Sequence, residues 1–262
     1  MKRTTEVPPL GAEHTHPIAR EATHEFVRRL FEPLPRGRVL DVPAGRGALA
    51  RRLAEQGFQM VACDLYPDLF EAQGISIHRG DLNGQLPFAD GAFDYVVCLE
   101  GLEHLENPHQ AAREFARVLR PGGQVIVSVP NILNVEERVK NLLYGYTSHF
   151  KPVSRAHLQQ RRIDFAAWRS RIGELDEVFL HVNPIGYPEL RFLLESSGFD
   201  SVRVFRDAKK PRQWLYFPLV WLIRLLGALR PAAQKEARWT RELQSDAILA
   251  GGNSIVVQAR RS

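Results

Sequence analysis

Residues 36 to 130 alternate short apolar runs of strand composition with segments in which apolar residues recur at helical spacing. This alternation is typical of β-α units, whose strands pair in a mostly parallel sheet. We therefore predict an α/β fold with a doubly wound, mostly parallel, seven-stranded sheet and helices on both faces. The first five predicted strands are 38–42, 59–64, 75–79, 93–99 and 124–129.

Three segments show the period of an amphipathic helix. Residues 17–31 predict a helix that covers one end of the sheet. Residues 46–57 predict a second helix that ends at Gly57, because glycine is a frequent C-terminal cap. A third helix begins at Pro108, and we expect the turn at 121–123 (Pro-Gly-Gly) to end it.

The regular alternation stops after residue 130 and returns near the C-terminus. Residues 187–199 predict a helix, and 201–205 and 253–260 predict strands. We divide the chain into an N-terminal helical cover (1–35) and a sheet domain (36–262). The domain carries insertions at about 131–180, an expected lid over the acceptor, and at about 207–250.

Composition places the chain among ordinary soluble globular proteins. It has 262 residues, of which 44% are hydrophobic and 25% are charged. Its two cysteines, Cys63 and Cys98, lie within apolar strands and have neither metal-ligand nor disulfide spacing, which favours a reducing compartment. The first residues lack the apolar stretch of a secretory signal, so we expect a cytoplasmic location.

The net charge of +5 is concentrated in one region. Residues 203–241 hold ten basic and two acidic residues, a net charge of +8, whereas the rest of the chain carries 25 basic and 28 acidic residues, a net charge of −3. The basic excess therefore belongs to the second insertion and not to the sheet domain.

Residues 39–49 are the segment most indicative of a ligand-binding site. In this segment a predicted buried strand ends at Asp41 and is followed by a tight turn and a helix. Gly45 and Gly47 leave room for a ligand to approach the backbone of this turn. The next strand ends at Asp64, close to the offset of an acid that binds ribose hydroxyls. These residues indicate a cofactor that contains adenosine.

The same segments resemble those of class I S-adenosylmethionine-dependent methyltransferases, which have a Rossmann-like fold. The family's first motif matches Asp41 through Gly47, although Pro43 stands at the first glycine position. Residues 80–108 resemble the adenine-side segment and the loop that faces the methionine end, and 118–131 resemble the next turn and strand. The resemblance implies that S-adenosylmethionine is bound by Asp41, Pro43, Ala44, Gly45, Gly47, Asp64, Leu65, Asp81, Leu82 and Leu99.

A nicotinamide-dependent dehydrogenase is the competing interpretation of this motif. Such enzymes bind a diphosphate at the turn, and a buried carboxylate there would repel it. S-adenosylmethionine has no phosphate and carries an ammonium and a sulfonium, which an acid such as Asp41 attracts. Asp41 therefore favours the methyl donor.

Methyl transfer to a hydroxyl requires alignment of the reacting atoms and removal of a proton. His104, in the loop after the fourth strand, is the first candidate for the base, and Glu100 and Glu103 are adjacent candidates. His149 and His181 lie in or beside the first insertion and are weaker candidates. No cluster of residues has metal-ligand spacing, so we expect no metal site.

Residues 181–199 resemble a segment of methyltransferases from glycan and cell-surface polysaccharide loci. The resemblance favours O-methylation of a glycan or a lipid-linked metabolite. A quinone precursor or another small hydroxylated molecule is the nearest enzymatic alternative. A scaffold that binds S-adenosylmethionine without catalysis is the alternative from another class.

Residues 214–229 form an apolar run of 16 residues, shorter than the roughly 20 that a membrane-spanning helix needs. A helix starting at Pro218 is apolar nearly all round, so it must be buried in the domain, in a dimer contact or in a lipid interface. Residues 209–235 are thus a candidate contact for an anionic membrane, which would place the protein at the inner face of the membrane, or for a homodimer. Aliphatic bulk between the basic residues makes nucleic acid an unfavourable partner.

Overall fold

The computed structural model describes residues 20–150, 181–208, 213–229 and 241–262. Its centre is a seven-stranded sheet with the order β3-β2-β1-β4-β5-β7-β6. The strands are β1 (Arg38–Asp41), β2 (Gln59–Asp64), β3 (Ser76–Arg79), β4 (Phe93–Leu99), β5 (Leu119–Pro130), β6 (Phe199–Arg206) and β7 (Ser254–Arg261). β1 to β5 pair in parallel, and β7 runs antiparallel to both β5 and β6.

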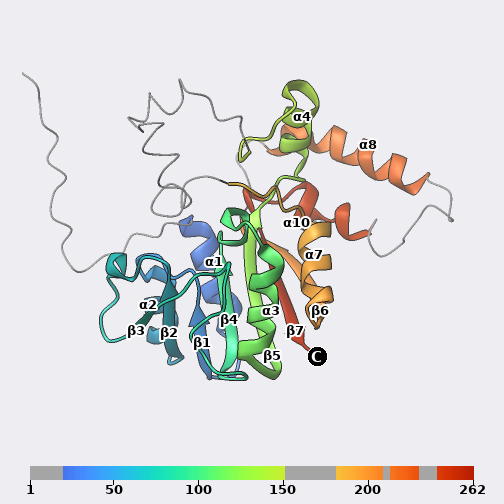
Figure 1. Cartoon of the computed structure of the whole chain (residues 1–262). Helices are drawn as coiled ribbons and strands as arrows, with labels where there is room; N and C mark the ends of the chain where they lie inside the picture. Colours follow the sequence, from blue (N-terminus) through green and yellow to red (C-terminus); the bar gives the residue numbers. More distant parts are fainter. Residues whose placement is uncertain (1–19, 151–180, 209–212, 230–240) are drawn as a thin grey trace, which may run out of the picture.

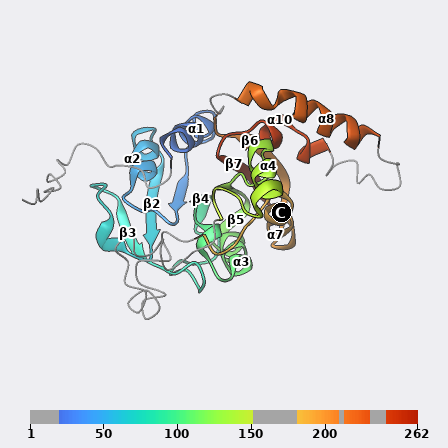
Figure 2. The same ribbon diagram turned by 90° about the horizontal axis from the view of Figure 1, so that it is seen from above.

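Helices cover both faces of this sheet (Figures 1 and 2). Phe115 and Leu190 belong to the apolar core on one face, and Phe31 and Leu53 belong to a second core on the other. The predicted doubly wound α/β fold is confirmed. The helices are α1 (Glu21–Phe31), α2 (Ala48–Glu55), α3 (Pro108–Val118), α4 (Val135–Tyr144), α7 (Tyr187–Ser196), α8 (Phe217–Ala228) and α10 (Asp246–Leu249), and the short 3-10 turns are η1 (Pro67–Leu69), η2 (Leu102–His104) and η3 (Gln213–Tyr216).

Local sequence explains where several elements begin and end. Asn107 accepts a hydrogen bond from the Gln110 amide and caps α3, and Pro108 occupies its first turn. Gly57 follows α2 with a φ of 89°, a conformation that side chains other than glycine rarely adopt. α3 ends at Val118, before the turn predicted at 121–123, and β5 begins earlier than predicted, at Leu119. Residues 120–123 lie between the pairs Leu119–Phe93 and Gln124–Tyr95, where the strand pairing is irregular and Gly122 has a φ of 75°.

The second insertion lies at the carboxyl edge of the parallel strands. β6 ends at this edge, and β7 starts from it and runs back antiparallel between β5 and β6. The elements between these two strands, including α8 and α10, therefore stay at the same edge, above the sheet in Figure 1. Residues 151–180, most of the expected lid, lie outside the described residues.

Burial of α8 in the domain core, one of three expected arrangements, is wrong. Within α8, Val220 and Gly227 are buried, whereas most of its large apolar side chains are exposed. Among the described residues, none of the helices combines the length and the hydropathy that a membrane-spanning segment requires.

Candidate methyl-donor and catalytic site

A cavity of about 460 Å³ opens at the carboxyl ends of β1, β2 and β4. β1 pairs with β2 on one side and with β4 on the other, so the chain reverses its direction of winding at this point. Ligands of open α/β sheets bind at such switch points. The fold thus places the predicted glycine turn and the loop after β4 on one cavity.

The turn after β1 depends on its glycines. Gly45 has a φ of 52° and Gly47 a φ of 84°, and a Cβ at Gly47 would lie 2.6 Å from the Phe70 ring. The Val42–Pro43 peptide bond is cis. A Cβ at Gly101 would lie 2.6 Å from Pro43 Cδ, so the loop after β4 packs directly on this turn. The glycines allow two chain segments to approach each other where the cavity begins.

Asp64, at the end of β2, joins the walls of the cavity. Its Oδ2 accepts a hydrogen bond from the Gly45 amide at 2.8 Å, and its Oδ1 accepts one from the Tyr66 amide at 2.9 Å. A carboxylate has about four acceptor positions, so both oxygens retain capacity for further donors. Asp64 therefore holds the glycine turn in place and can also accept hydrogen bonds from ribose hydroxyls.

Asp41 provides a buried carboxyl group that lacks a full set of partners. The side chain lines the cavity, the residue is 2% exposed, and its Oδ2 has no hydrogen-bond partner. Burial, followed by the nearby Asp64 carboxylate, raises the pKa of Asp41 to about 8. A buried carboxyl group with one oxygen free of hydrogen bonds fits the ammonium of S-adenosylmethionine, which would stabilise its charged form.

The structure brings most other predicted donor residues to the same cavity. Asp81 and Leu82 line it beyond β3, and the Asp81 Oδ1 accepts a hydrogen bond from the Asn83 amide at 2.8 Å. Gly47 does not line the cavity, and its role is to shape the turn and begin α2. The remaining predicted residues that line it are Pro43, Ala44, Gly45, Leu65 and Leu99.

Glu100 follows β4 with a φ of 49° and also lines the cavity. The Ser128 hydroxyl donates a hydrogen bond to its Oε1 at 2.8 Å, and Ser254 bonds the same carboxyl group. Burial raises the pKa of Glu100 to about 7. Hydrogen bonds to β5 and β7 thus hold a carboxyl group that titrates near neutral pH beside the cavity.

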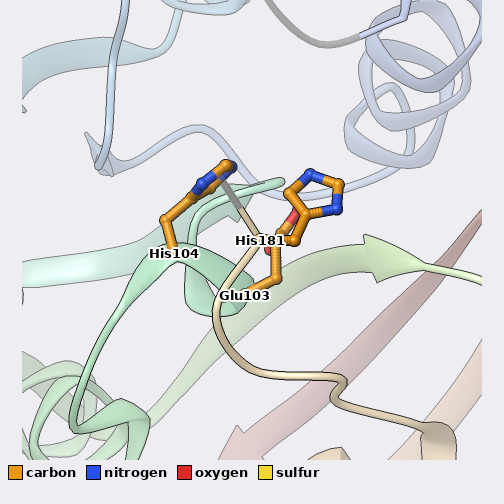
Figure 3. Close-up of side chains that lie close together, drawn as sticks. All are labelled: Glu103, His104 and His181. Carbon is orange, nitrogen blue, oxygen red and sulfur yellow. The ribbon is translucent and has the colours of Figure 1, made fainter. Parts of the chain in front are cut away.

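Glu103, His104 and His181 lie close together beside the cavity, with the buried Glu103 beneath the two imidazole rings (Figure 3). One carboxylate oxygen of Glu103 and one ring nitrogen of each histidine lie within 4.8 Å of one another. Glu103 is fully buried, both of its oxygens lack a hydrogen-bond partner, and burial raises its pKa well above the usual range. Such a group can share a proton, and its donor set can also hold a divalent cation.

The predicted histidines gather although they are far apart in the sequence. The rings of His104 and His181 are 4.9 Å apart between centroids, and His181 Nδ1 lies 3.1 Å from the His149 carbonyl oxygen. Burial, followed by the charges of the neighbouring histidines, lowers the pKa of His181 to about 4. All three histidines line the cavity, whereas the buried Glu103 does not. The expectation of no metal-ligand cluster missed this group, because sequence spacing does not reveal that His181 returns to η2.

Sequence reasoning also missed cavity residues on the covering helix and the last strand. His24 on α1 and Ser254 on β7 line the cavity, together with Arg20. Burial, followed by the charge of Arg52, lowers the pKa of His24 to about 4. The helical period predicts the apolar face of α1, but it gives no signal that one end of this helix reaches the site.

Comparisons with known proteins agree with this geometry. A family model described as a methyltransferase domain matches residues 14–204. The ubiquinone biosynthesis O-methyltransferase of Xanthomonas euvesicatoria pv. vesicatoria is 31% identical over 169 residues, which cover 59% of this chain and 69% of that protein. Its counterpart in Xanthomonas campestris pv. campestris is 35% identical over 109 residues, 37% of this chain and 45% of that protein. The expected similarity to enzymes of glycan loci is not tested by these matches and stays a prediction.

Solved structures share the fold. The YcgJ protein of Bacillus subtilis aligns with a TM-score of 0.55 and 19% identity over 92% of this chain and 99% of that one. Phosphoethanolamine N-methyltransferase 2 of Haemonchus contortus, solved with S-adenosyl-L-methionine, aligns with a TM-score of 0.50 and 16% identity over 91% of this chain and 52% of that one. The family match, together with the buried Asp41, whose Oδ2 has no hydrogen-bond partner, and the glycine turn, leads to one assignment. The chain belongs to the methyltransferase-domain family and is a class I S-adenosylmethionine-dependent methyltransferase.

Proposed function

We propose that the protein methylates a hydroxyl group of a quinone precursor or a closely related hydroxylated aromatic molecule. The observation that carries this proposal is the 31% identity, over 69% of its length, to a protein named ubiquinone biosynthesis O-methyltransferase. The predicted quinone-precursor alternative is therefore preferred to the glycan and lipid-linked acceptors that the sequence first favoured.

The residues around the cavity divide into a donor side and an acceptor side. S-adenosylmethionine supplies an activated methyl group when it is bound. Asp41 would neutralise its ammonium, and Asp64 would accept hydrogen bonds from its ribose. Glu100, His104 and His181 also line the cavity, and we expect a hydroxylated acceptor to lie beside them.

His104 is our candidate for the group that accepts the hydroxyl proton. It lines the cavity, and the buried carboxyl group of Glu103 lies on its inner side. The neutral imidazole of His104 would accept the proton that leaves the acceptor hydroxyl, and Glu103 lies close enough to position the ring. Glu100 is tied to Ser128 and Ser254, and we assign it a positioning role at the cavity wall.

A direct test uses purified protein with methyl-labelled S-adenosylmethionine and fractionated extracts of lipid-soluble quinone precursors, polysaccharide and RNA. The proposal predicts label in an aromatic methyl ether of the lipid-soluble fraction. The Asp64→Ala variant is the matched control, because it should lose label in every fraction through weaker donor binding. Label confined to polysaccharide or RNA, and equally a failure to label any fraction while the donor binds, would overturn the proposed acceptor.

A further inference from the structure

The outer side of α8 and of η3, the turn before it, is an apolar surface. Its side chains are exposed, with Trp221 at 66% and Leu226 at 56%. Isolated exposed apolar residues are ordinary, but a continuous set of this kind marks a contact surface. The α8 surface consists of Trp214, Leu215, Phe217, Trp221, Leu222, Leu225, Leu226 and Leu229.

The opposite side of α8 is fixed to the domain. Val220 is buried in one apolar cluster with Val135 of α4 and Leu249 of α10. The Arg224 guanidinium donates hydrogen bonds to the Gln244 carbonyl oxygen at 3.0 Å and to Asp246 Oδ1 at 2.7 Å. The packing of α8 therefore presents its apolar surface outward on a helix that is anchored along its inner side. The helix itself lies at the periphery of the molecule in both views (Figures 1 and 2).

The exposed residues follow the helical period. Trp214, Phe217, Trp221, Leu225 and Leu229 are spaced by three or four positions and form one stripe, and Leu222 and Leu226 widen it. A helix of 12 residues is about 18 Å long, which is shorter than the roughly 30 Å hydrocarbon core of a bilayer. Its length and its wide stripe suit a position in the plane of a membrane surface, where tryptophan rings are favoured.

Charge favours a lipid surface over a second copy of the chain. Lys209, Lys210 and Arg212 directly precede η3 in the sequence, and Arg230 directly follows Leu229, within a region of net charge +8. A twofold contact through α8 would bring two such regions together, and like charges repel. Anionic head groups would neutralise the same residues. We propose that the α8 surface binds the protein to a membrane that contains anionic lipids, with the helix lying in the interface.

The proposal also relates the membrane to the cavity. α4 follows β5 at the carboxyl edge, packs on α8 through Val135, and exposes Leu142 and Leu143 near its end. After α4 the chain folds back on this helix, where the Ser148 amide donates a hydrogen bond to Glu137 Oε2 at 2.6 Å. The next residue, His149, lines the cavity. An apolar acceptor held in the bilayer would thus meet the protein at the end where the cavity lies. This last step rests on the proposed function, whereas membrane binding itself does not.

Vesicle sedimentation tests membrane binding without donor or acceptor, so its outcome is independent of the proposed function. We expect the protein to bind vesicles of phosphatidylcholine with phosphatidylglycerol, and to bind pure phosphatidylcholine much more weakly. Added salt should lower the binding, because it screens the basic residues. Trp221→Glu and Leu226→Glu should each weaken the partition constant by roughly tenfold or more, since each removes a large apolar side chain from the interface.

Phe192→Glu is the matched control, because Phe192 is 61% exposed but lies on α7. This variant should bind vesicles like the wild type, and all three variants should keep wild-type affinity for S-adenosylmethionine, which verifies folding. Equal binding of the α8 variants and the wild type would overturn the proposal, as would equal binding of the wild type to neutral and anionic vesicles. A dimer in light scattering that Leu226→Glu dissociates, without vesicle binding, would assign the α8 surface to a second copy instead.

Discussion

Replacing Asp41 by asparagine removes a carboxyl group whose ionisation we expect donor binding to drive. Asp41 is buried at the end of β1, its Oδ2 has no partner, and its other contact is a hydrogen bond from the Ala50 amide. Asparagine keeps the size of the side chain and an oxygen that can accept from Ala50. The substitution therefore changes the charge available to the donor ammonium with little change in packing.

The pKa of Asp41 sets the size of the effect. Burial raises it from 3.8 to about 8, so the group is mostly neutral at neutral pH when no donor is bound. Ionising it one pH unit below its pKa costs about 1.4 kcal/mol, a factor of ten in affinity. Donor affinity of the wild type should therefore increase about tenfold between about pH 6 and pH 7, and binding should release close to one proton.

The raised pKa of Asp41 affects stability in the opposite direction: increasing pH strengthens donor binding but lowers the stability of the donor-free protein. In the donor-free protein the pKa of Asp41 is raised from 3.8, so the folded state holds a proton that the unfolded chain releases more readily. This contribution to stability is present at acid pH and is lost as pH increases from about 4 towards 8. Asparagine does not titrate, so the Asp41→Asn variant lacks this pH-dependent loss of stability. The melting temperature of the variant minus that of the wild type should therefore increase with pH over this range.

Isothermal titration calorimetry measures both the affinity and the proton release, the latter by comparing buffers of different ionisation enthalpy. The Asp41→Asn variant should bind S-adenosylmethionine more weakly at neutral pH, with an affinity that does not change with pH and without proton release. Methylthioadenosine, which lacks the amino-acid part, is the control ligand and should bind both proteins with little pH dependence. A wild-type affinity that is constant between about pH 6 and pH 7 would refute this reasoning.

Three further substitutions test the geometry of the site. Gly47→Ala should lower the free energy of unfolding by about 1–3 kcal/mol in denaturant titrations, because the φ of 84° is strained for alanine and its Cβ would clash with Phe70. A variant as stable as the wild type would contradict this close packing. Asp64→Ala should weaken donor binding by roughly tenfold or more, since it removes the ribose acceptor and the bond to Gly45, and unchanged affinity would rule out that role. His104→Ala should lower kcat by about 100-fold or more while the donor dissociation constant is kept, and near-normal turnover would exclude His104 as the base.

The fold could be predicted from sequence wherever hydrophobic period and end signals agree. The strands from β1 to β4 and the start of α3 at Pro108 match the predicted ranges closely. β1, β2 and β4 are buried parallel strands with short continuous apolar runs, and proline marks a first helical turn. The start of β5 at Leu119, which pairs with Phe93, was not predicted, because the Pro-Gly-Gly sequence at 121–123 has turn composition and lies in an irregularity before the pairing resumes at Gln124. The exposure of α8 was also not predictable, because composition does not tell which apolar helix the domain buries.

The donor side of the site could be predicted almost completely, since it is a continuous motif whose residues follow the ends of neighbouring strands. Asp41, Gly45 and Asp64 lie where strand order places them. The acceptor side depends on contacts between distant segments, such as His181 with Glu103, and a single sequence does not encode these contacts in any local pattern. His24 reaches the cavity from α1 for the same reason.

The most direct test of the proposed O-methyltransferase activity is to identify the atom that receives the methyl group. Purified protein would be incubated with methyl-labelled S-adenosylmethionine and a catechol that carries a prenyl chain, and the product would be analysed by mass spectrometry and by chemical cleavage of methyl ethers. We predict a single labelled methyl ether on a ring oxygen, formed by the wild type and strongly reduced in His104→Ala. Methyl transfer to a ring carbon or to nitrogen, or no transfer to this acceptor by protein that binds the donor, would contradict the proposal.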